Sequence, residues 1–212
     1  MIVRWLGHAA FSINLPGALD GHLCLDPHAP GVLGGRFALP EIQGPFDAVL
    51  ITHRHEDHCA WRPSLGTDRM IDADGSVGPY DVRFRGVPHD AVDGRQMGWV
   101  RMASVDDGAH RVVHAGDLAG FSAADVAWLR GVDVLLVPVG GTYTLDGAGA
   151  AAFTRAVEPR WVVPMHGADP AIDLPLAPVS DFLAALGWPV AATPVLDLGS
   201  PPPERHVVLL AR

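Results

Sequence analysis

The sequence predicts a layered α/β fold, with two packed sheets and helices covering them. Short strand-like segments fill the first half of the chain, and helix and strand patterns alternate in the second half. No repeat, heptad pattern or linker divides the 212 residues. With 49% hydrophobic residues, a chain of this length can bury one substantial core. We therefore expect a single domain over residues 1–212.

The strands of the first half are predicted from short apolar runs that end at turn residues. These runs are Ile2–Leu6, Ala10–Leu15, His22–Leu25, Asp47–Thr52, Asp81–Val87, Gly98–Ala103 and Arg111–His114. The run Asp47–Thr52 has the composition of a buried strand and leads directly into His53. A Gly/Pro-rich loop is expected over residues 27–45, and residues 61–79 are expected to be loop with one helical turn.

The second half predicts helices separated by strands. Ser122 and Asp125 form a capping-box pattern that opens a helix through Arg130. An alanine-rich helix is expected at Gly147–Val157, and Ser180 is expected to cap a helix through Leu186. The strands of this half are expected at Val132–Val137, Trp161–Pro164 and His206–Leu210.

Composition excludes several functional classes. A net charge of −9 disfavours nucleic acid as a partner, because acidic surfaces repel phosphate backbones. All 15 basic residues are arginines, which excludes lysine Schiff-base chemistry. No apolar stretch is long enough to span a bilayer and the first residues lack a signal-peptide pattern, so we expect a cytoplasmic protein without stable membrane association.

The segment His53-Arg-His55-Glu-Asp57-His58 carries the strongest chemical signal in a chain with eleven histidines. In an extended loop, side chains two residues apart point the same way, so His53 and His55 can share one metal ion. Asp57 and His58 point apart and can serve a neighbouring ion. Imidazole and carboxylate ligands suit zinc, manganese or iron. A chance cluster on a solvated turn is the alternative, but the segment follows a buried strand, where loops carry sites.

Several motifs in order along the chain resemble the metallo-β-lactamase superfamily. Within it, they are most similar to the branch of ascorbate-6-phosphate-lactonase-like and N-acylphosphatidylethanolamine phospholipase D-like hydrolases. The resemblance rests on the blocks Trp5–Phe11, Leu25–Pro27, Thr52–His58, Val87–Asp90, His114–Asp117 and Pro164–Gly167. It implies a four-layer αββα sandwich.

The resemblance also implies two divalent metal ions, with zinc expected first and manganese or iron as alternatives. In its ligand set, His53, His55 and His89 bind the first ion, Asp57, His58 and His166 bind the second, and Asp117 bridges both. The late members of this set, His89, Asp117 and His166, each follow a strand-like run. Strand ends can therefore bring them to a shared site.

This ligand set predicts hydrolysis of a small ester, lactone or phosphodiester in an open cleft. Two metal ions lower the pKa of a shared water from about 15.7 towards 7, so that it attacks as hydroxide. They also polarise the bond under attack. The resemblance implies that Asp57 hydrogen-bonds this nucleophile and later carries a proton. Two other hypotheses stay open: a diiron oxidoreductase with the same ligands, and a non-catalytic metal-binding protein.

Three further residues are candidates for the surroundings of the metals. Asp26 is either a turn residue at a strand end or, as the resemblance implies, a group that orients the His53–His58 loop. His8 either packs within its turn or points into the cleft towards substrate. Tyr143 follows a Gly-Gly-Thr segment, and the resemblance places that loop near the metals and the substrate.

The remaining polar candidates are interpreted more simply. Arg54 either attracts an anionic substrate or is solvated. Cys59 is expected to be a small residue packed behind the site, and His114 is expected to be structural. Four further histidines are expected at the surface: His22, His28, His110 and His206. The sequence leaves the substrate, the native metal and the oligomeric state open.

Overall fold

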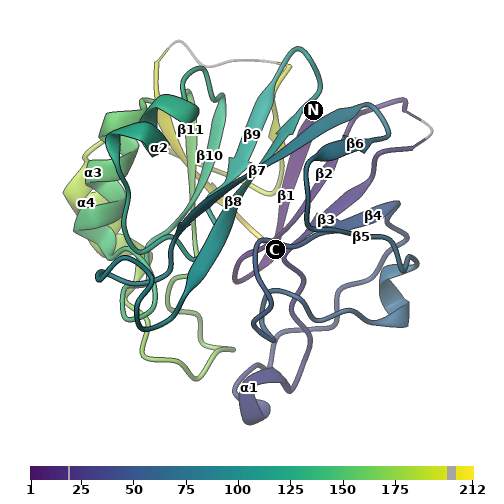
Figure 1. Cartoon of the computed structure of the whole chain (residues 1–212), viewed down its shortest axis with the longest axis horizontal. Helices are drawn as coiled ribbons and strands as arrows, with labels where there is room; N and C mark the ends of the chain where they lie inside the picture. The colour runs from purple at the N-terminus through teal and green to yellow at the C-terminus, as the bar shows by residue number, and fades with distance from the viewer. Residues whose placement is uncertain (19, 200–203) are drawn as a thin grey trace.

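Two sheets lie face to face in the structure, a computed structural model that describes residues 1–18, 20–199 and 204–212 (Figure 1). The six-stranded sheet has the order β13-β1-β2-β3-β4-β5. Its strands are β1 (Ile2–Gly7), β2 (Ala10–Asn14), β3 (Leu23–Leu25), β4 (Ala48–Leu50), β5 (Met70–Ile71) and β13 (Leu196–Asp197). Strands β1, β2 and β3 pair antiparallel, whereas β3, β4 and β5 run parallel.

The eight-stranded sheet has the order β12-β14-β11-β10-β9-β8-β7-β6. Its strands are β6 (Gly75–Val77), β7 (Tyr80–Pro88), β8 (Trp99–Asp106), β9 (Arg111–His114), β10 (Val134–Pro138), β11 (Trp161–Met165), β12 (Val190–Thr193) and β14 (His206–Leu210). The β6–β9 part is antiparallel, and the part from β9 to β12 is parallel. The carboxyl ends of the parallel strands all lie at the same end of the sheet.

Strand β10 shows why the larger sheet is buried on both faces. Val134 and Leu136 face the core between the sheets, whereas Leu135 and Val137 face the core beneath the helices. Side chains alternate across a strand, so a continuous apolar run supplies both cores.

Three helices cover the outer face of this sheet (Figure 1): α2 (Ala123–Trp128), α3 (Gly147–Val157) and α4 (Val179–Leu186). The predicted capping box at α2 is confirmed, because Ser122 and Asp125 each bond the other's backbone N–H. The prediction of Ser180 as the cap of α4 is wrong. The extended residue before the helix is Pro178, and Ser180 lies in its first turn. Within the described residues, no helix has the length and apolar character to cross a bilayer.

The predicted α/β class, with two sheets, is confirmed. The outer layer over the smaller sheet differs from that over the larger one, because in the described residues it consists mainly of loops. Ile42, Phe46 and Leu65 pack there against Cys24 and Val49. Two single-turn elements lie in these loops, α1 (Val32–Gly35) and the 3-10 turn η1 (Pro63–Leu65). The Gly/Pro-rich composition of residues 27–45 explains this, since both residue types disfavour helix interiors.

Four strands were not predicted, and they are β5, β6, β12 and β13. Each lies at an edge of its sheet. They have two to four residues, and most of their side chains are exposed or half-buried. An edge strand of this kind has no buried face to impose apolar alternation. Residues 61–79 therefore contain β5 and β6 in addition to the expected helical turn at η1.

Candidate metal centre

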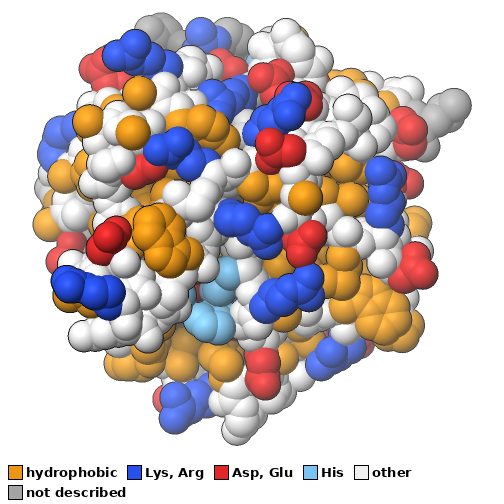
Figure 2. Space-filling model, viewed as in Figure 1, with side chains coloured by type: hydrophobic (Ala, Val, Ile, Leu, Met, Phe, Trp, Pro, Cys, Tyr) orange, Lys and Arg blue, Asp and Glu red, His pale blue; other side chains and the backbone are white. Residues whose placement is uncertain are grey.

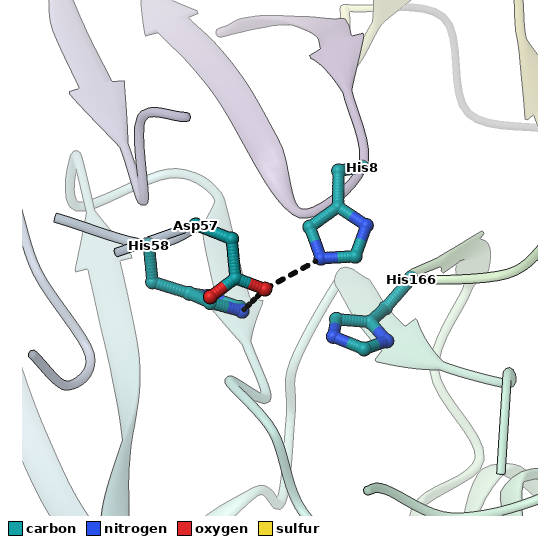
Figure 3. Close-up of side chains that lie close together, drawn as sticks. All are labelled: His8, Asp57, His58 and His166. Atoms are coloured by element: carbon teal, nitrogen blue, oxygen red, sulfur yellow. Dashed lines mark hydrogen bonds and ion pairs between the residues drawn. The ribbon is translucent and has the colours of Figure 1, made fainter. Parts of the chain in front are cut away.

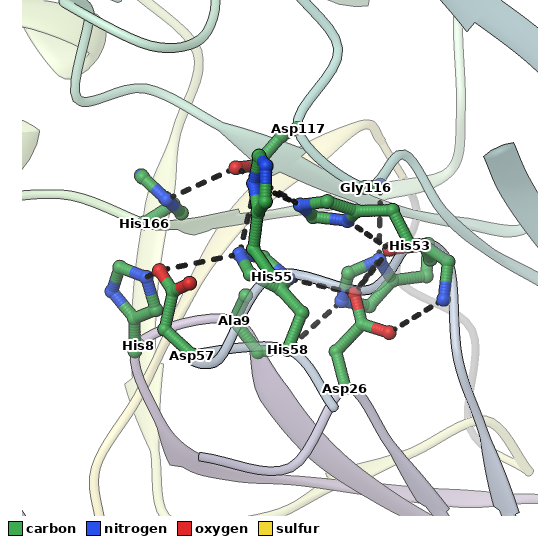
Figure 4. A network of polar contacts seen from close by, with 12 residues as sticks. His8, Ala9, Asp26, His53, His55, Asp57, His58, Gly116, Asp117 and His166 are labelled. Carbon is green, nitrogen blue, oxygen red and sulfur yellow. Dashed lines mark hydrogen bonds and ion pairs between the residues drawn. The ribbon is translucent and has the colours of Figure 1, made fainter. Parts of the chain in front are cut away.

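The predicted site residues come together at one end of the two sheets (Figure 4). Each lies in a turn or loop that follows the carboxyl end of a strand. His8 follows β1, Asp26 follows β3, the His53–His58 loop follows β4, His89 follows β7, Asp117 follows β9 and His166 follows β11. Both sheets thus contribute, as expected for a site formed where loops leave a rigid scaffold.

Three of these residues have an unusual backbone. His8, Asp26 and His166 have φ values of 52°, 43° and 53°, in the left-handed region that side chains disfavour. The turn at His8 is held in place, because its carbonyl accepts hydrogen bonds from Trp5 Nε1 (2.9 Å) and from the His166 N–H (3.2 Å). Such strained residues persist where surrounding contacts fix them, and they cluster at functional sites.

One cluster of potential metal ligands consists of His53, His55, His89 and Asp117, with one atom of each within 4.8 Å of the others. His55 Nδ1 lies 3.0 Å from His53 Nε2 and 3.4 Å from His89 Nε2. Asp117 Oδ2 lies 3.7 Å from His53 Nε2 and 3.8 Å from His89 Nε2. His55 is exposed and the other three are buried, so the cluster opens on one side.

A second cluster consists of His8, Asp57, His58 and His166, all of them buried (Figure 3). Asp57 Oδ2 lies 3.1 Å from His8 Nε2 and 3.6 Å from His58 Nε2. Asp117 also reaches this cluster. Its Oδ1 lies 3.2 Å from His58 Nε2, and its Oδ2 lies 3.5 Å from His166 Nε2. The Asp117 carboxylate therefore stands between the two clusters.

Hydrogen bonds behind the histidines orient their rings. His58 Nδ1 lies 2.9 Å from Asp26 Oδ2, and His89 Nδ1 lies 3.1 Å from the Asp117 carbonyl. His53 Nδ1 lies 3.0 Å from Thr52 Oγ1, which itself donates to Asp26 Oδ2. Because these partners accept, each Nδ1 carries a proton and each Nε2 is the ring atom that faces the clusters. Metal-binding histidines are typically held this way.

The electrostatics of the site favour a bound cation. Burial alone would lower the pKa of His58, but the Asp117 and Asp57 carboxylates outweigh burial and raise it well above its usual value. Burial alone would raise the pKa of Asp117, but His166 and His58 outweigh burial and lower it. Burial, followed by the charge of His58, lowers the pKa of His53 to about 3. Charged carboxylates are thus buried beside a neutral His53 ring and a His58 ring that is protonated when no metal ion is bound.

Several polar atoms here are buried without a hydrogen bond from the described residues. They include His58 Nε2 and Asp117 Oδ1, which lie 3.2 Å apart but are not aligned to bond each other. Leaving a buried polar atom unpaired costs about 1–3 kcal/mol. Metal ions would satisfy these atoms, and nitrogen and carboxylate donors at this spacing suit zinc and similar metals. The residues present therefore fit metal ions.

The structure places Asp26 behind the His53–His58 loop. Asp26 Oδ1 accepts from the Thr52 N–H (2.8 Å), and Oδ2 accepts from Thr52 Oγ1 and His58 Nδ1. His8 points into the site and contacts Asp57, an arrangement that no local sequence signal specifies. Tyr143 lines the cavity above the clusters.

Other candidates lie outside the clusters. Arg54 is 68% exposed and pairs with Asp72 at 2.7 Å. Cys59 is half-buried at the edge of an apolar cluster. His114 is buried, donating from Nε2 to the Ala9 carbonyl and accepting at Nδ1 from the Gly116 N–H.

The expectation that His28 lies at the surface is wrong. His28 is buried, and its Nε2 lies 3.2 Å from the Leu6 carbonyl, with its ring beside Phe37. The loop that follows β3 folds back over the end of β1. Sequence composition alone does not show this return of the chain.

Comparison with known proteins places the chain in a family. The model of the β-lactamase superfamily domain matches residues 2–166. A UPF0173 metal-dependent hydrolase of Polaromonas sp. is 29% identical, over 87% of this chain and 83% of its own length. A UPF0173 protein of Pyrococcus furiosus is 30% identical, over 78% of this chain and 83% of its own length.

A solved structure gives the same result. A Thermotoga maritima protein, described as a candidate zinc-dependent hydrolase of the metallo-β-lactamase superfamily, is 27% identical with a TM-score of 0.75. The match covers 99% of this chain and 97% of that chain. The chain is therefore a metal-dependent hydrolase of the metallo-β-lactamase superfamily and belongs to its UPF0173 family.

Proposed function

We propose that the protein hydrolyses a small ester, lactone or phosphodiester with the help of two divalent metal ions, zinc being the first expectation. The observation that carries this proposal is the position of Asp117, whose carboxylate oxygens lie within 3.8 Å of histidines from both clusters. A single carboxylate can serve two ions when each takes one oxygen.

The proposed ligands divide between the clusters as the sequence motifs imply. One ion would be held by His53, His55 and His89, the other by Asp57, His58 and His166, and Asp117 would bridge them. When bound, two such ions lower the pKa of a shared water and polarise the bond under attack. The Nε2 atoms of His53, His58 and His89 are already aimed by their Nδ1 partners, so little reorganisation is needed on binding.

Asp57 is proposed to handle the proton. His8 holds its Oδ2 at 3.1 Å, and the carboxylate lines the cavity above the clusters. Burial would raise the pKa of Asp57, but His58 and then His8 outweigh burial and lower it, so the group stays ionised. An ionised Asp57 can accept a hydrogen bond from the attacking water, take its proton and pass it to the leaving group.

The size of the cavity supports a small-molecule substrate. It measures about 370 Å³, near the lower end of ligand pockets in proteins. The net charge of −9 argues against nucleic acid as the substrate. Lactones and phosphodiesters are the classes that the motif resemblance implies, and simple esters follow the same chemistry.

The test is a substrate panel with controlled metal content. Purified protein is assayed with bis(p-nitrophenyl) phosphate, p-nitrophenyl acetate and an aliphatic lactone. The assays are repeated after chelation and after addition of Zn²⁺, Mn²⁺ or Fe²⁺. We expect turnover of at least one class, its loss with chelator and its recovery with metal. Asp57→Asn is expected to lower that turnover.

Two outcomes contradict the proposal. Full metal binding without turnover of any class contradicts the proposed substrates and favours a metal-binding role without this chemistry. Bound iron with near-ultraviolet or visible absorption and oxygen consumption, but no hydrolysis, indicates the diiron oxidoreductase.

A further inference from the structure

The cavity above the candidate metal residues has walls of a distinct chemistry. Its floor is formed by five of the candidate metal residues, and its walls carry Leu33, Arg36, Met97, Tyr143 and Leu174. In the space-filling view, histidines lie in a hollow near the middle of the face (Figure 2). The floor accounts for the chemistry of the site, and the walls therefore determine which molecules bind there.

Hydrogen bonds and apolar packing hold the wall that carries Arg36 in place. The Arg36 carbonyl accepts from the Asp173 N–H at 2.8 Å, which joins this segment to the loop that carries Leu174. The Leu33 N–H donates to Glu56 Oε2 at 2.8 Å, within the metal-ligand loop. Both loops share a small apolar cluster around Phe37. The backbone at Arg36 is thus fixed relative to the site, although the side chain is exposed.

Arg36 supplies a positive charge that no carboxylate of the described residues neutralises. It is the one arginine among the lining residues, and the lining carboxylates, Asp57 and Asp117, both belong to the metal clusters. Among the described residues, no carboxylate lies within ion-pair distance of Arg36, whereas the Arg54 guanidinium pairs with Asp72 at 2.7 Å. In a chain of net charge −9, an uncompensated arginine at the mouth of the site favours an anionic ligand.

The other wall residues are mainly apolar. Leu33 and Leu174 lie on the two loops that these hydrogen bonds hold in place. Met97 also lines the cavity and is 38% exposed. Asp90 fixes the Met97 loop by accepting N–H bonds from Gln96 and Met97, each at 2.8 Å. The cavity therefore combines the guanidinium of Arg36 with an apolar surface large enough for a short alkyl or aromatic group.

We propose that the cleft selects a small organic anion that carries an apolar substituent. Its anionic group pairs with Arg36, and its apolar part lies against Leu33, Met97 and Leu174. This inference rests on the proposed function, since it narrows the substrate to an anionic ester, lactone or phosphodiester. A neutral ester of the same size gains only the apolar contacts.

Binding of stable analogues tests this without turnover. Benzylphosphonate, phenylacetate and neutral benzyl alcohol are titrated calorimetrically into metal-containing wild type, Arg36→Gln and Arg62→Gln. Arg62 is an exposed arginine that does not line the cavity, so it provides the matched control. Metal content and melting temperature are compared in all three proteins.

We expect Arg36→Gln to weaken binding of at least one anion about tenfold or more, as loss of a charge-assisted hydrogen bond implies. Arg62→Gln should bind like wild type, and benzyl alcohol should bind all three proteins equally weakly. A loss for phosphonate alone identifies a phosphate-type substrate, and a loss for phenylacetate identifies a carboxylate. Leu174→Ser is titrated in the same way, with inorganic phosphate as an additional ligand. It should bind benzylphosphonate and phenylacetate more weakly than wild type does, and inorganic phosphate equally well.

Equal binding of every anion by Arg36→Gln and Arg62→Gln overturns the inference. This outcome is distinct from failure of the proposed function. Hydrolysis of neutral esters without any effect of Arg36 refutes only the anion preference. Arg36-dependent binding in a protein that hydrolyses nothing refutes only the hydrolysis.

Discussion

His8 Nε2 lies 3.1 Å from Asp57 Oδ2, and both side chains are buried although 49 residues separate them. The contact joins the turn after β1 to the His53–His58 loop after β4 (Figure 3). Burial, followed by the charge of His166, lowers the pKa of His8 to about 3, so the ring is neutral at physiological pH. A neutral ring that contacts a carboxylate donates its Nε2–H, and this bond fixes one oxygen of Asp57.

This relationship predicts that His8 positions Asp57. We expect His8→Ala to lower kcat about 10–100-fold, the range typical for residues that orient metal-site groups. The metal content should stay at the wild-type value. His8→Gln should recover part of the loss, because its amide can donate to Asp57 from nearly the same place. Turnover and elemental analysis of the two variants provide the test.

Loss of one metal from His8→Ala would instead identify His8 as a ligand, which its place in the second cluster permits geometrically. Wild-type turnover in His8→Ala would show that the contact with Asp57 has no role in the reaction.

Asp117→Asn tests the bridge between the clusters. Asparagine has nearly the same shape, but it lacks the negative charge and its nitrogen cannot coordinate. We expect the variant to lose at least one metal ion and most of the turnover, by more than the roughly 10–100-fold typical of outer groups. Bound metal and turnover are measured on the same preparation.

A simple turn residue would behave differently. Asparagine favours turns nearly as well as aspartate, so metal content, turnover and melting temperature would all survive. That result would leave the two clusters without a shared ligand.

His114 predicts how the stability of the metal-free protein depends on pH. Burial lowers the pKa of His114, with Asp26 acting in the opposite direction. The unfolded chain therefore binds the proton first as the pH falls below about 6.5, and the free energy of unfolding decreases there. One such group contributes a slope of up to about 1.4 kcal/mol per pH unit.

In the variant His114→Asn, the amide oxygen can still accept from the Gly116 N–H, but the side chain cannot take up the proton. We expect His114→Asn to be less stable than wild type at pH 8 by about 1–3 kcal/mol, through loss of the bond to Ala9. Its stability should also fall less steeply between pH 6.5 and 5. Urea unfolding of both metal-free proteins at several pH values measures the two slopes, and equal slopes would contradict the assignment.

The inner strands could be predicted from the sequence because a buried strand has a recognisable run of apolar residues. β10 is apolar throughout, since it faces a core on each side, and β4 is apolar for the same reason. The four edge strands have exposed residues and no such pattern, so they were missed. The capping box at Ser122 could be predicted because it is a local motif, whereas α4 begins after Pro178 without a side-chain cap that would mark its start.

The candidate site was predictable to a similar extent. Its clustered residues, such as His53 and His55, were found because they occupy one short segment. The contact of His8 with Asp57 and the place of Arg36 in the cavity wall depend on contacts between segments that lie far apart in the sequence. The Arg36 segment also contains left-handed backbone at Leu33 and at neighbouring glycines, which apolar periodicity does not encode.

The number of metal ions per chain tests the central claim most directly. Protein saturated with Zn²⁺ and freed of excess metal is analysed for zinc and for protein concentration. The two clusters joined by Asp117 predict about two zinc ions per chain, with both removed by chelator together with turnover. One ion per chain, or none, would contradict the dinuclear site.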